Sequence, residues 1–255
     1  MIWLWTYFRA IAGGIFFVGY TMFIAVGIVL FGSLNQTKIL NAIIWYWAYF
    51  PLKFLGIEVK AFGVENLPRA RGGLFVFNHQ SHFDILAFHL VADLTVRFGA
   101  KIELFKIPLF GHGMRAAGAL PIVRENRSEV FKVYKESEIR IARGESFILA
   151  PEGTRQATPK IGSFKKGPFM FAINAKAPLI PTVIVGSYEV MSKHDWLPNV
   201  GRMKRTIEIH FLKPIDTMGK ENQIAELTNQ VHDEMEKCFN ERHAVMYPEA
   251  TSPAK

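Results

Sequence analysis

The feature that most constrains this chain is a long apolar run near its N-terminus. Arg9 is the only charged residue before Lys38, and the stretch from Ala10 to Leu34 carries no charge at all. As a helix, this stretch is long enough to cross the roughly 30 Å hydrocarbon layer of a bilayer. It is too long for the apolar region of a signal peptide, and no basic start precedes it. We therefore predict that residues 1–31 form a membrane segment rather than a buried core helix.

A second apolar stretch, Ile39–Leu55, is rich in aromatic residues and is flanked by lysines. Tryptophan and tyrosine rings gather at the headgroup level of membranes, and Lys38 and Lys53 could reach lipid phosphates. Two geometries fit this pattern: a helical hairpin that dips into one leaflet, or one spanning helix followed by an interfacial helix. In both, residues 1–55 are an N-terminal membrane-associated helical segment.

After Gly56, short β-like runs alternate with helix-like stretches. The β-like runs are Ile57–Phe62, Leu74–Phe77, Thr95–Phe98, Ala119–Val123, Phe147–Ala150, Leu179–Val185 and Thr206–Leu212. The helix-like stretches are Ser81–Ala92, Asn126–Arg143, Lys165–Ala175 and Lys220–Asn240. This alternation predicts an α/β domain over residues 56–247, with a mostly parallel or mixed sheet flanked by helices. Residues 248–255 are predicted to be a disordered tail.

The chain is basic, and it contains a single cysteine. Thirty Lys and Arg residues against 22 Asp and Glu residues give a net charge of +8. Such a charge indicates an acidic partner: nucleic acid, an anionic membrane or a phosphorylated substrate. No zinc finger or other nucleic-acid motif is present, so nucleic acid is not an expected partner. One cysteine, Cys238, excludes an intramolecular disulfide, and we predict that this thiol is inert.

The segment 78–84, N-H-Q-S-H-F-D, carries the strongest sign of chemistry. It follows an apolar strand and leads into a helix, so His79 should lie at the C-terminal end of a strand, where open α/β folds place their sites. Asp84 falls in the first helical turn, and the chain turns between the two residues. A histidine held by a carboxylate has a fixed tautomer and a stabilised conjugate acid, as a general base for a hydroxyl requires.

Two other interpretations of this segment remain open at this point. The pattern S-x-x-D resembles a capping box, in which Asp84 would only cap its helix. His79, His82 and Asp84 could also be metal ligands, but no second ligand cluster supports a metal site.

A second signal, P-E-G-T-R over residues 151–155, also follows directly after an apolar strand. Proline and glycine favour a loop there. Thr154, Arg155 and backbone N–H groups could bind a phosphate, which arginine holds through two hydrogen bonds. The alternative is an ordinary turn between a strand and a helix, with a solvated arginine.

In these motifs the sequence resembles the 1-acylglycerol-3-phosphate acyltransferases of the glycerolipid acyltransferase family. Residues 78–84 are similar to the N-H-x4-D block of that family, and residues 118–124, G-A-L-P-I-V-R, to its second block. Residues 151–155 are similar to its P-E-G-T-R block, and residues 180–184, I-P-T-V-I, to its fourth. The segments that begin at Lys101, K-I-E-L, and at Phe164, F-K-K-G, add two further matches. The resemblance covers roughly residues 57–212.

The sequence departs from the family pattern at two blocks. In the second block, P-I-V precedes Arg124 where the family carries an aromatic residue, Ile and Asp, so no acidic role can be assigned there. The third block is flanked by Ala150 and Gln156 where the family has Phe and Ser. Neither departure removes a group that performs the chemistry.

The resemblance implies that an acyl group passes from acyl-CoA or acyl-carrier protein to lysophosphatidic acid, with no cofactor. His79 would be the catalytic base and Asp84 its orienting partner. Arg124, Arg155 and Lys101 would hold the acceptor phosphate with the loop Glu152-Gly153-Thr154. Backbone N–H groups near Ser81 or Gly153 could stabilise the oxyanion. A covalent intermediate is not expected, because the chain lacks a G-x-S-x-G elbow.

Several alternatives stay open. The acceptor could be another lysolipid, such as lysophosphatidylglycerol or an ornithine-containing lysolipid. His79 could instead activate water, which would make the chain a thioesterase or lipid hydrolase, or the chain could be a membrane-anchored scaffold. As a lipid acyltransferase, the chain would lie at the inner membrane of a bacterium, with its catalytic domain on the cytoplasmic side. Anionic lipid at that surface would account for the net charge of +8.

Overall fold

A single mixed sheet forms the centre of the molecule. The computed structural model describes residues 2–34, 36–199 and 205–248, with the backbone alone for residues 2–10 and 33. The sheet order is β1-β7-β6-β2-β5-β3-β4, and every pairing is parallel except that of β6 with β7. The strands are β1 (Ile57–Phe62), β2 (Leu74–Phe77), β3 (Val96–Lys101), β4 (Leu120–Ile122), β5 (Ser146–Leu149), β6 (Leu179–Val185) and β7 (Arg205–Phe211). The predicted α/β class with a mixed sheet is confirmed.

The central strands are buried on both faces, which explains why their sequences are continuous apolar runs. Every residue of β2, β5 and β6 is buried. Side chains of β2 alternate between two cores: Leu74 and Val76 join one, and Phe75 and Phe77 join the other. The sheet therefore needs a layer of helices on each face.

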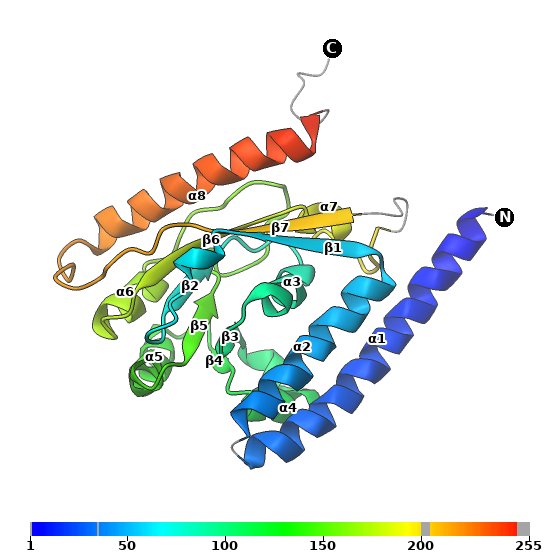
Figure 1. Cartoon of the computed structure of the whole chain (residues 1–255), viewed down its shortest axis with the longest axis horizontal. Coiled ribbons are helices and arrows are strands. Elements are labelled where there is room, and N and C mark those ends of the chain that lie inside the picture. The colour runs from blue at the N-terminus through cyan, green and yellow to red at the C-terminus, as the bar shows by residue number, and fades with distance from the viewer. Residues whose placement is uncertain (1, 35, 200–204, 249–255) are drawn as a thin grey trace.

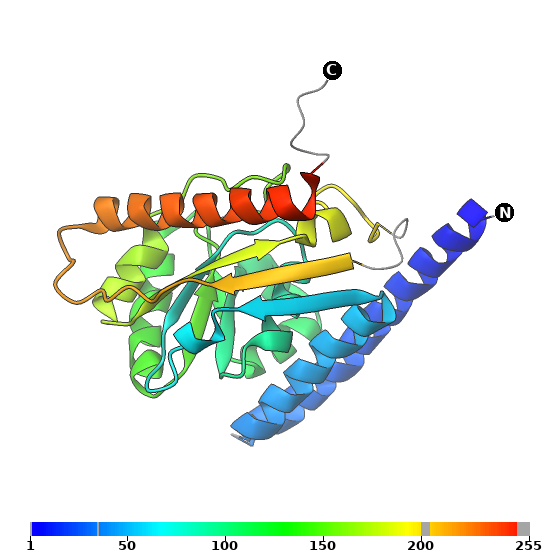
Figure 2. The same ribbon diagram turned by 45° about the horizontal axis from the view of Figure 1, so that its top comes forward.

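Helices supply both layers (Figure 1, Figure 2). The core around Leu74 is completed by α5 (Arg127–Ala142), α6 (Gly167–Asn174) and α8 (Ile224–Met246). The core around Phe75 is completed by α3 (Phe83–Val91) and by α2 (Thr37–Phe54). Shorter elements connect them: α4 (Phe110–Ala116), α7 (Ser187–Val190) and the 3-10 turns η1 (Val64–Asn66) and η2 (Ile102–Lys106).

The N-terminal hairpin of α1 (Ile2–Ser33) and α2 packs along one flank of the α/β domain (Figure 2). The Trp47 indole donates a hydrogen bond to the Thr21 hydroxyl at 3.1 Å, and the Tyr20 hydroxyl donates one to the Tyr46 carbonyl at 2.9 Å. The C-terminal half of α1 also lies against α4. A Cβ atom added at Gly32 would stand 2.9 Å from the Ala116 carbonyl oxygen, so the two backbones meet closely there.

The outer face of the hairpin exposes a continuous set of large apolar side chains. The exposed residues on α1 and α2 include Ile11, Ile15, Val18, Phe23, Leu30, Ile39, Tyr46, Phe50 and Phe54. Within α1, residues Ile11–Gly32 are long and apolar enough to cross a membrane, and little of this stretch is buried. Both predicted apolar segments are therefore helices, and they form a hairpin that is integral to the fold.

The sequence patterns missed α4, and packing explains why. Two of its seven residues are glycine, a composition that is typical of a loop. A Cβ atom at Gly111 would lie 2.2 Å from the Phe105 carbonyl oxygen, and one at Gly113 would lie 3.0 Å from the Ala25 Cβ atom. The glycines allow close approach on both sides of a short helix. The tail predicted to be disordered lies outside the described residues from position 249 onward.

Candidate active site

His79 and Asp84 are in direct contact at the C-terminal end of β2. The His79 Nδ1 atom lies 2.8 Å from an Asp84 carboxylate oxygen, Oδ2. Asp84 is fully buried, whereas the His79 side chain keeps 13% of its surface exposed. The carboxylate is thus shielded from water, while the imidazole can be reached from the outside.

The same Asp84 oxygen also forms hydrogen bonds with the backbone of the turn. It accepts hydrogen bonds from the N–H groups of Gln80 at 2.8 Å and Ser81 at 2.9 Å. The bond from the Ser81 N–H, together with that from the Phe83 N–H to the Ser81 hydroxyl at 3.3 Å, has the pattern of a capping box, so Asp84 caps the start of α3 and also holds His79. Because Oδ2 accepts the hydrogen bond from His79, the imidazole carries its proton on Nδ1, and Nε2 is left as the basic nitrogen.

Asn78 fixes this turn to the sheet, a role that the sequence patterns did not suggest. Its side-chain amide donates to the Ile184 carbonyl at 2.8 Å and accepts from the Ile184 N–H at 2.7 Å. The amide thereby continues the β2–β6 ladder by one step after the strand has ended. The backbone consequently enters the His79 turn from a fixed position. In the sequence, only the presence of Asn78 directly before His79 in the motif pointed to this role.

The loop after β5 lies beside the His79 turn. Its Gln156 N–H donates to the His79 carbonyl at 2.8 Å, and the Lys165 N–H donates to the Pro151 carbonyl at 2.8 Å. Gly153 has a φ of +75°, a conformation that side-chain-bearing residues rarely adopt, and its N–H closes a turn on the Ala150 carbonyl. The two motifs predicted to act together are therefore joined directly through their backbones.

Glu152 is buried within this loop. Its side chain is 6% exposed, and neither carboxylate oxygen has a hydrogen-bond partner of normal geometry among the described residues. Burial raises the pKa of Glu152 to about 8, and the nearby Gln156 amide and Gly162 N–H oppose that rise only in part. Glu152 is therefore largely protonated at neutral pH, so it does not act there as a fixed counterion for the basic residues.

Arg155 lies on the same side of the site as the catalytic pair. Its guanidinium interacts electrostatically with Asp84, and its Nη1 atom is buried without a hydrogen-bond partner among the described residues. Burial and the positive charge of Arg155 lower the pKa of His82 to about 4. His82 is therefore neutral at physiological pH, and the Arg155 guanidinium keeps a hydrogen-bonding group without a partner among the described residues.

The other predicted phosphate ligands form a second group. Lys101 ends β3 and lies 3.5 Å from Glu103, while Arg124 follows β4 and is half-buried, with Glu125 and Glu103 as its charged neighbours. Glu103 therefore links Lys101 and Arg124. Thr154 is exposed in its loop. No contact joins these residues to Arg155 in the described part of the chain, so their common action on one phosphate stays a prediction.

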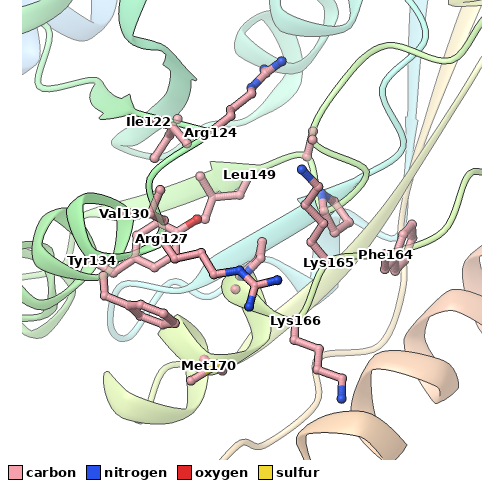
Figure 3. Close-up of a pocket in the computed structure, with 17 residues that line it drawn as sticks. Ile122, Arg124, Arg127, Val130, Tyr134, Leu149, Phe164, Lys165, Lys166 and Met170 are labelled. Atoms are coloured by element: carbon pink, nitrogen blue, oxygen red, sulfur yellow. The ribbon is translucent and has the colours of Figure 1, made fainter.

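The Gly153 loop also contributes to the wall of a cavity of about 630 Å³, which Figure 3 shows. It lies between β5, α5 and α6, and Arg124, Arg127, Lys165 and Lys166 are among its 17 lining residues. Its walls include the rings of Phe131, Tyr134 and Phe164. His79 and Arg155 do not line this cavity, but Gly153 and Pro151 do.

Comparison with known proteins decides the family. A family model described as Acyltransferase matches residues 58–185, which include the His79 turn, the Gly153 loop and β6. The chain belongs to the acyltransferase family. The matched region also carries Arg124 and Lys101, so each predicted site residue of this acyltransferase lies inside it.

Relatives with curated names are 1-acyl-sn-glycerol-3-phosphate acyltransferases. The chain is 34% identical to a chloroplastic one from Brassica napus, over 66% of this chain and 50% of that protein. It is 29% identical to one from Haemophilus influenzae, over 77% of this chain and 80% of that protein. The acyltransferase chain thus spans half the length of the Brassica relative.

A solved structure shares the whole fold. The acyltransferase resembles the crystal structure of the 1-acyl-sn-glycerophosphate acyltransferase PlsC from Thermotoga maritima, with a TM-score of 0.77 and 26% identity. The match covers 98% of this chain and 100% of that chain, so it includes the N-terminal hairpin.

Proposed function

We propose that this acyltransferase transfers an acyl group from a thioester, acyl-CoA or acyl-carrier protein, to the sn-2 hydroxyl of 1-acyl-sn-glycerol-3-phosphate. The product is phosphatidic acid. The observation that carries the proposal is the contact between His79 Nδ1 and a buried Asp84 carboxylate, beside a loop that offers an unsatisfied arginine N–H. The names of the curated relatives support the choice of acceptor.

The proposed chemistry needs no covalent enzyme intermediate. His79 Nε2 takes the proton of the acceptor hydroxyl as the oxygen attacks the thioester carbonyl. Asp84 holds the imidazole and stabilises the imidazolium that forms, since its Oδ2 atom lies 2.8 Å from Nδ1. Collapse of the tetrahedral intermediate breaks the C–S bond, and the imidazolium returns its proton to the departing thiolate.

Arg155 is the proposed first ligand of the acceptor phosphate. Its guanidinium interacts electrostatically with Asp84, which supports a phosphate position near the catalytic pair. A charge-assisted hydrogen bond from the free Nη1 atom would hold the acceptor in position. Lys101 and Arg124 would complete the phosphate site from β3 and β4.

We also propose that the hairpin is immersed in one leaflet of a bacterial inner membrane, with the α/β domain on its cytoplasmic face. The close contacts of α1 with α4 support this geometry, because a helix standing across the bilayer would carry α4 into the hydrocarbon. Exposed apolar side chains on the outer face of the hairpin would contact lipid tails. The basic surface of the domain would then face anionic headgroups.

The test uses purified full-length protein in mixed micelles with acyl-CoA or acyl-carrier protein and lysophosphatidic acid. Thiol release and phosphatidic acid formation are followed together. We expect equal amounts of both products, and their loss in the His79→Ala variant at an unchanged melting temperature. His82→Ala is the matched control, because His82 lies in the same turn as His79 and has no place in the mechanism.

The other functions left open by the sequence give different results in this assay. Thiol release without diacyl product would identify a hydrolase. Faster turnover with lysophosphatidylglycerol or a lyso-ornithine lipid would identify another acceptor. Neither product from any thioester would leave a lipid-binding scaffold, and an active His79→Ala variant would contradict the mechanism.

A further inference from the structure

Four basic side chains line the cavity between β5, α5 and α6: Arg124, Arg127, Lys165 and Lys166. Of these, the proposed acceptor site uses only Arg124, and none of the 17 lining residues is Asp or Glu. We infer that this cavity binds the nucleotide end of coenzyme A, with its phosphates on Arg127, Lys165 and Lys166. This inference rests on the proposed transfer from a thioester and selects the carrier of the acyl group.

The spread of the cations favours a ligand with several separate phosphates. In Figure 3, Arg127 reaches into the middle of the cavity, while Arg124 and Lys166 extend toward opposite ends. A phosphate monoester is compact and is held best by donors that converge on one point. The nucleotide end of coenzyme A carries a diphosphate and a 3′-phosphate at different ends of a ribose, and this arrangement matches divergent cations.

The position of Arg127 is costly for its own helix, which points to a role in binding. Arg127 is the first residue of α5, where the helix dipole favours an anion over a cation. Asn126 already caps this end, accepting from the Ser128 and Glu129 N–H groups. An anion bound by Arg127 would remove the electrostatic conflict.

The size and walls of the cavity suit a nucleotide. A volume of about 630 Å³ lies within the range of roughly 300–1,000 Å³ that is usual for small-molecule sites. Phe131 and Phe164 contribute aromatic surface next to the cations. Aromatic rings beside basic side chains provide stacking for a base and charge for its phosphates.

The cavity also communicates with the catalytic turn. Gly153 and Pro151 form part of its wall, and Gln156 of the same loop donates its N–H to the His79 carbonyl. Lys165 covers Gly153 so closely that an added Cβ atom would lie 2.9 Å from its ammonium group. The flexible pantetheine arm of a bound nucleotide would thus cross this loop to bring the thioester to His79.

A concave site with aromatic walls favours a nucleotide over a carrier protein. An acidic carrier protein would dock on a basic surface that projects outward, because its phosphopantetheine is attached to a folded domain. Here the central cation, Arg127, reaches into the hollow. The two donors therefore predict different effects of substitutions inside the cavity.

The experiment measures the binding of coenzyme A itself to the full chain in detergent micelles, by titration calorimetry. We expect wild-type protein to bind it, and the dissociation constant to rise on the order of tenfold in Arg127→Ala and in Lys166→Ala. Lys132→Ala is the matched control, because Lys132 is an exposed cation of α5 that does not line the cavity. Pantetheine, which lacks the nucleotide, should bind all four proteins equally weakly.

Steady-state kinetics provide a second readout. Arg127→Ala should raise KM for palmitoyl-CoA on the order of tenfold and leave KM for lysophosphatidic acid within twofold. An unchanged dissociation constant in both cavity variants overturns the inference, as does a wild-type chain that binds no coenzyme A. Equal losses with acyl-carrier protein as donor, without binding of coenzyme A, would assign the cavity to the carrier protein and also overturn it.

Binding in the absence of turnover separates this inference from the proposed function. If coenzyme A binds in the cavity but no acyl group reaches lysophosphatidic acid, the proposed acceptor fails and the nucleotide site stands. If phosphatidic acid forms normally and the cavity variants bind coenzyme A as the wild type does, the nucleotide site fails alone.

Discussion

At the scale of single residues, one carboxylate oxygen both caps a helix and holds the histidine proposed as the catalytic base. The sequence of the His79 turn allowed both, since S-x-x-D begins many helices. Asp84 Oδ2 accepts from Nδ1 of His79 and from the Gln80 and Ser81 N–H groups, so the same oxygen holds the imidazole and caps the start of α3. That one carboxylate serves both purposes depends on the backbone geometry of the turn and cannot be taken from residue spacing.

The proposed role of Arg155 leads to a prediction about substrate binding. Arg155→Ala should raise KM for lysophosphatidic acid at least tenfold, because a charge-assisted hydrogen bond to the phosphate is lost. KM for the acyl donor should change little, as Arg155 does not line the cavity with the divergent cations. Steady-state kinetics with each substrate varied in turn provide the measurement.

Arg71→Ala serves as the control for that variant, because Arg71 is an exposed arginine that lies before β2, whereas His79 follows that strand. A KM for lysophosphatidic acid that is unchanged in Arg155→Ala would move the phosphate site to Lys101 and Arg124 alone.

Burial of Glu152 leads to a prediction about pH and stability. Its pKa in the folded state is about 8 against an ordinary value of 4.5, so folding favours the protonated form. The stability that this provides is complete below pH 4.5 and is lost as the pH rises through 8. Glu152→Gln keeps the neutral shape, so its melting temperature should gain a few degrees on the wild type between pH 5.5 and 8.5.

Thermal unfolding in detergent at several pH values checks this sign. If the melting temperatures of the two proteins change in parallel across that pH range, Glu152 is charged in the folded state.

At the scale of elements, the sequence was informative where burial is uniform. The boundaries predicted for β2 and β6 agree with the structure, because strands covered on both faces are unbroken apolar runs. Those of β1 agree as well, although its residues alternate between apolar and polar and the strand is only partly buried. Helix α4 was missed because its glycines allow close contacts, that of Gly113 with Ala25 of α1 being distant in sequence and that of Gly111 with Phe105 of η2 being local. Likewise, nothing in the spacing of Arg124 and Arg155 could reveal that Arg124 lines the cavity and Arg155 does not.

The contact of α1 with α4 leads to a prediction about the hairpin. Gly32→Leu should destabilise the protein by about 1–3 kcal/mol, because its side chain would meet the Ala116 backbone at a spacing that has no room for it. Gly19→Leu is the matched control on the same helix, since nothing lies within 4 Å of its Cβ position. Both changes improve helix propensity, so that effect alone would stabilise both variants.

Thermal unfolding and limited proteolysis of the segment between α1 and α2 measure the outcome. If the Gly32→Leu and Gly19→Leu variants have the same melting temperature, the stability of the protein does not depend on the contact between α1 and α4.

At the scale of the whole molecule, composition predicted a membrane partner but could not choose its geometry. The apolar run permits a spanning helix by length alone, and a net charge of +8 permits any anionic surface. Packing adds the missing constraint, because α1 and α2 both contact the α/β domain through α4 and α3. Such contacts form between segments far apart in the chain, and small residues that allow them look like ordinary membrane sequence.

A hairpin in one leaflet predicts that both ends of this chain lie on the same side of the membrane. Protease-cleavable tags at the two ends should be cut together in inside-out vesicles and protected together in right-side-out vesicles. Cleavage of the two tags from opposite sides would instead establish a spanning helix, and the contacts of α1 with α4 would then have to open in the membrane.

The direct attachment of the hairpin to the α/β domain also affects how the acceptor lipid would reach the active site. The Trp45 indole donates a hydrogen bond to the Leu90 carbonyl of α3 at 3.1 Å, and Gly32 packs closely against Ala116 of α4. These contacts hold the active site at a fixed height relative to the hairpin. An active site held at a fixed depth can bind only lysolipid that lies in the same membrane surface, and this acceptor reaches it by lateral diffusion. Its velocity would then follow the mole fraction of lysolipid in the surface, and diluting the membrane with inert lipid would slow the reaction even when the total amount of lysolipid is unchanged.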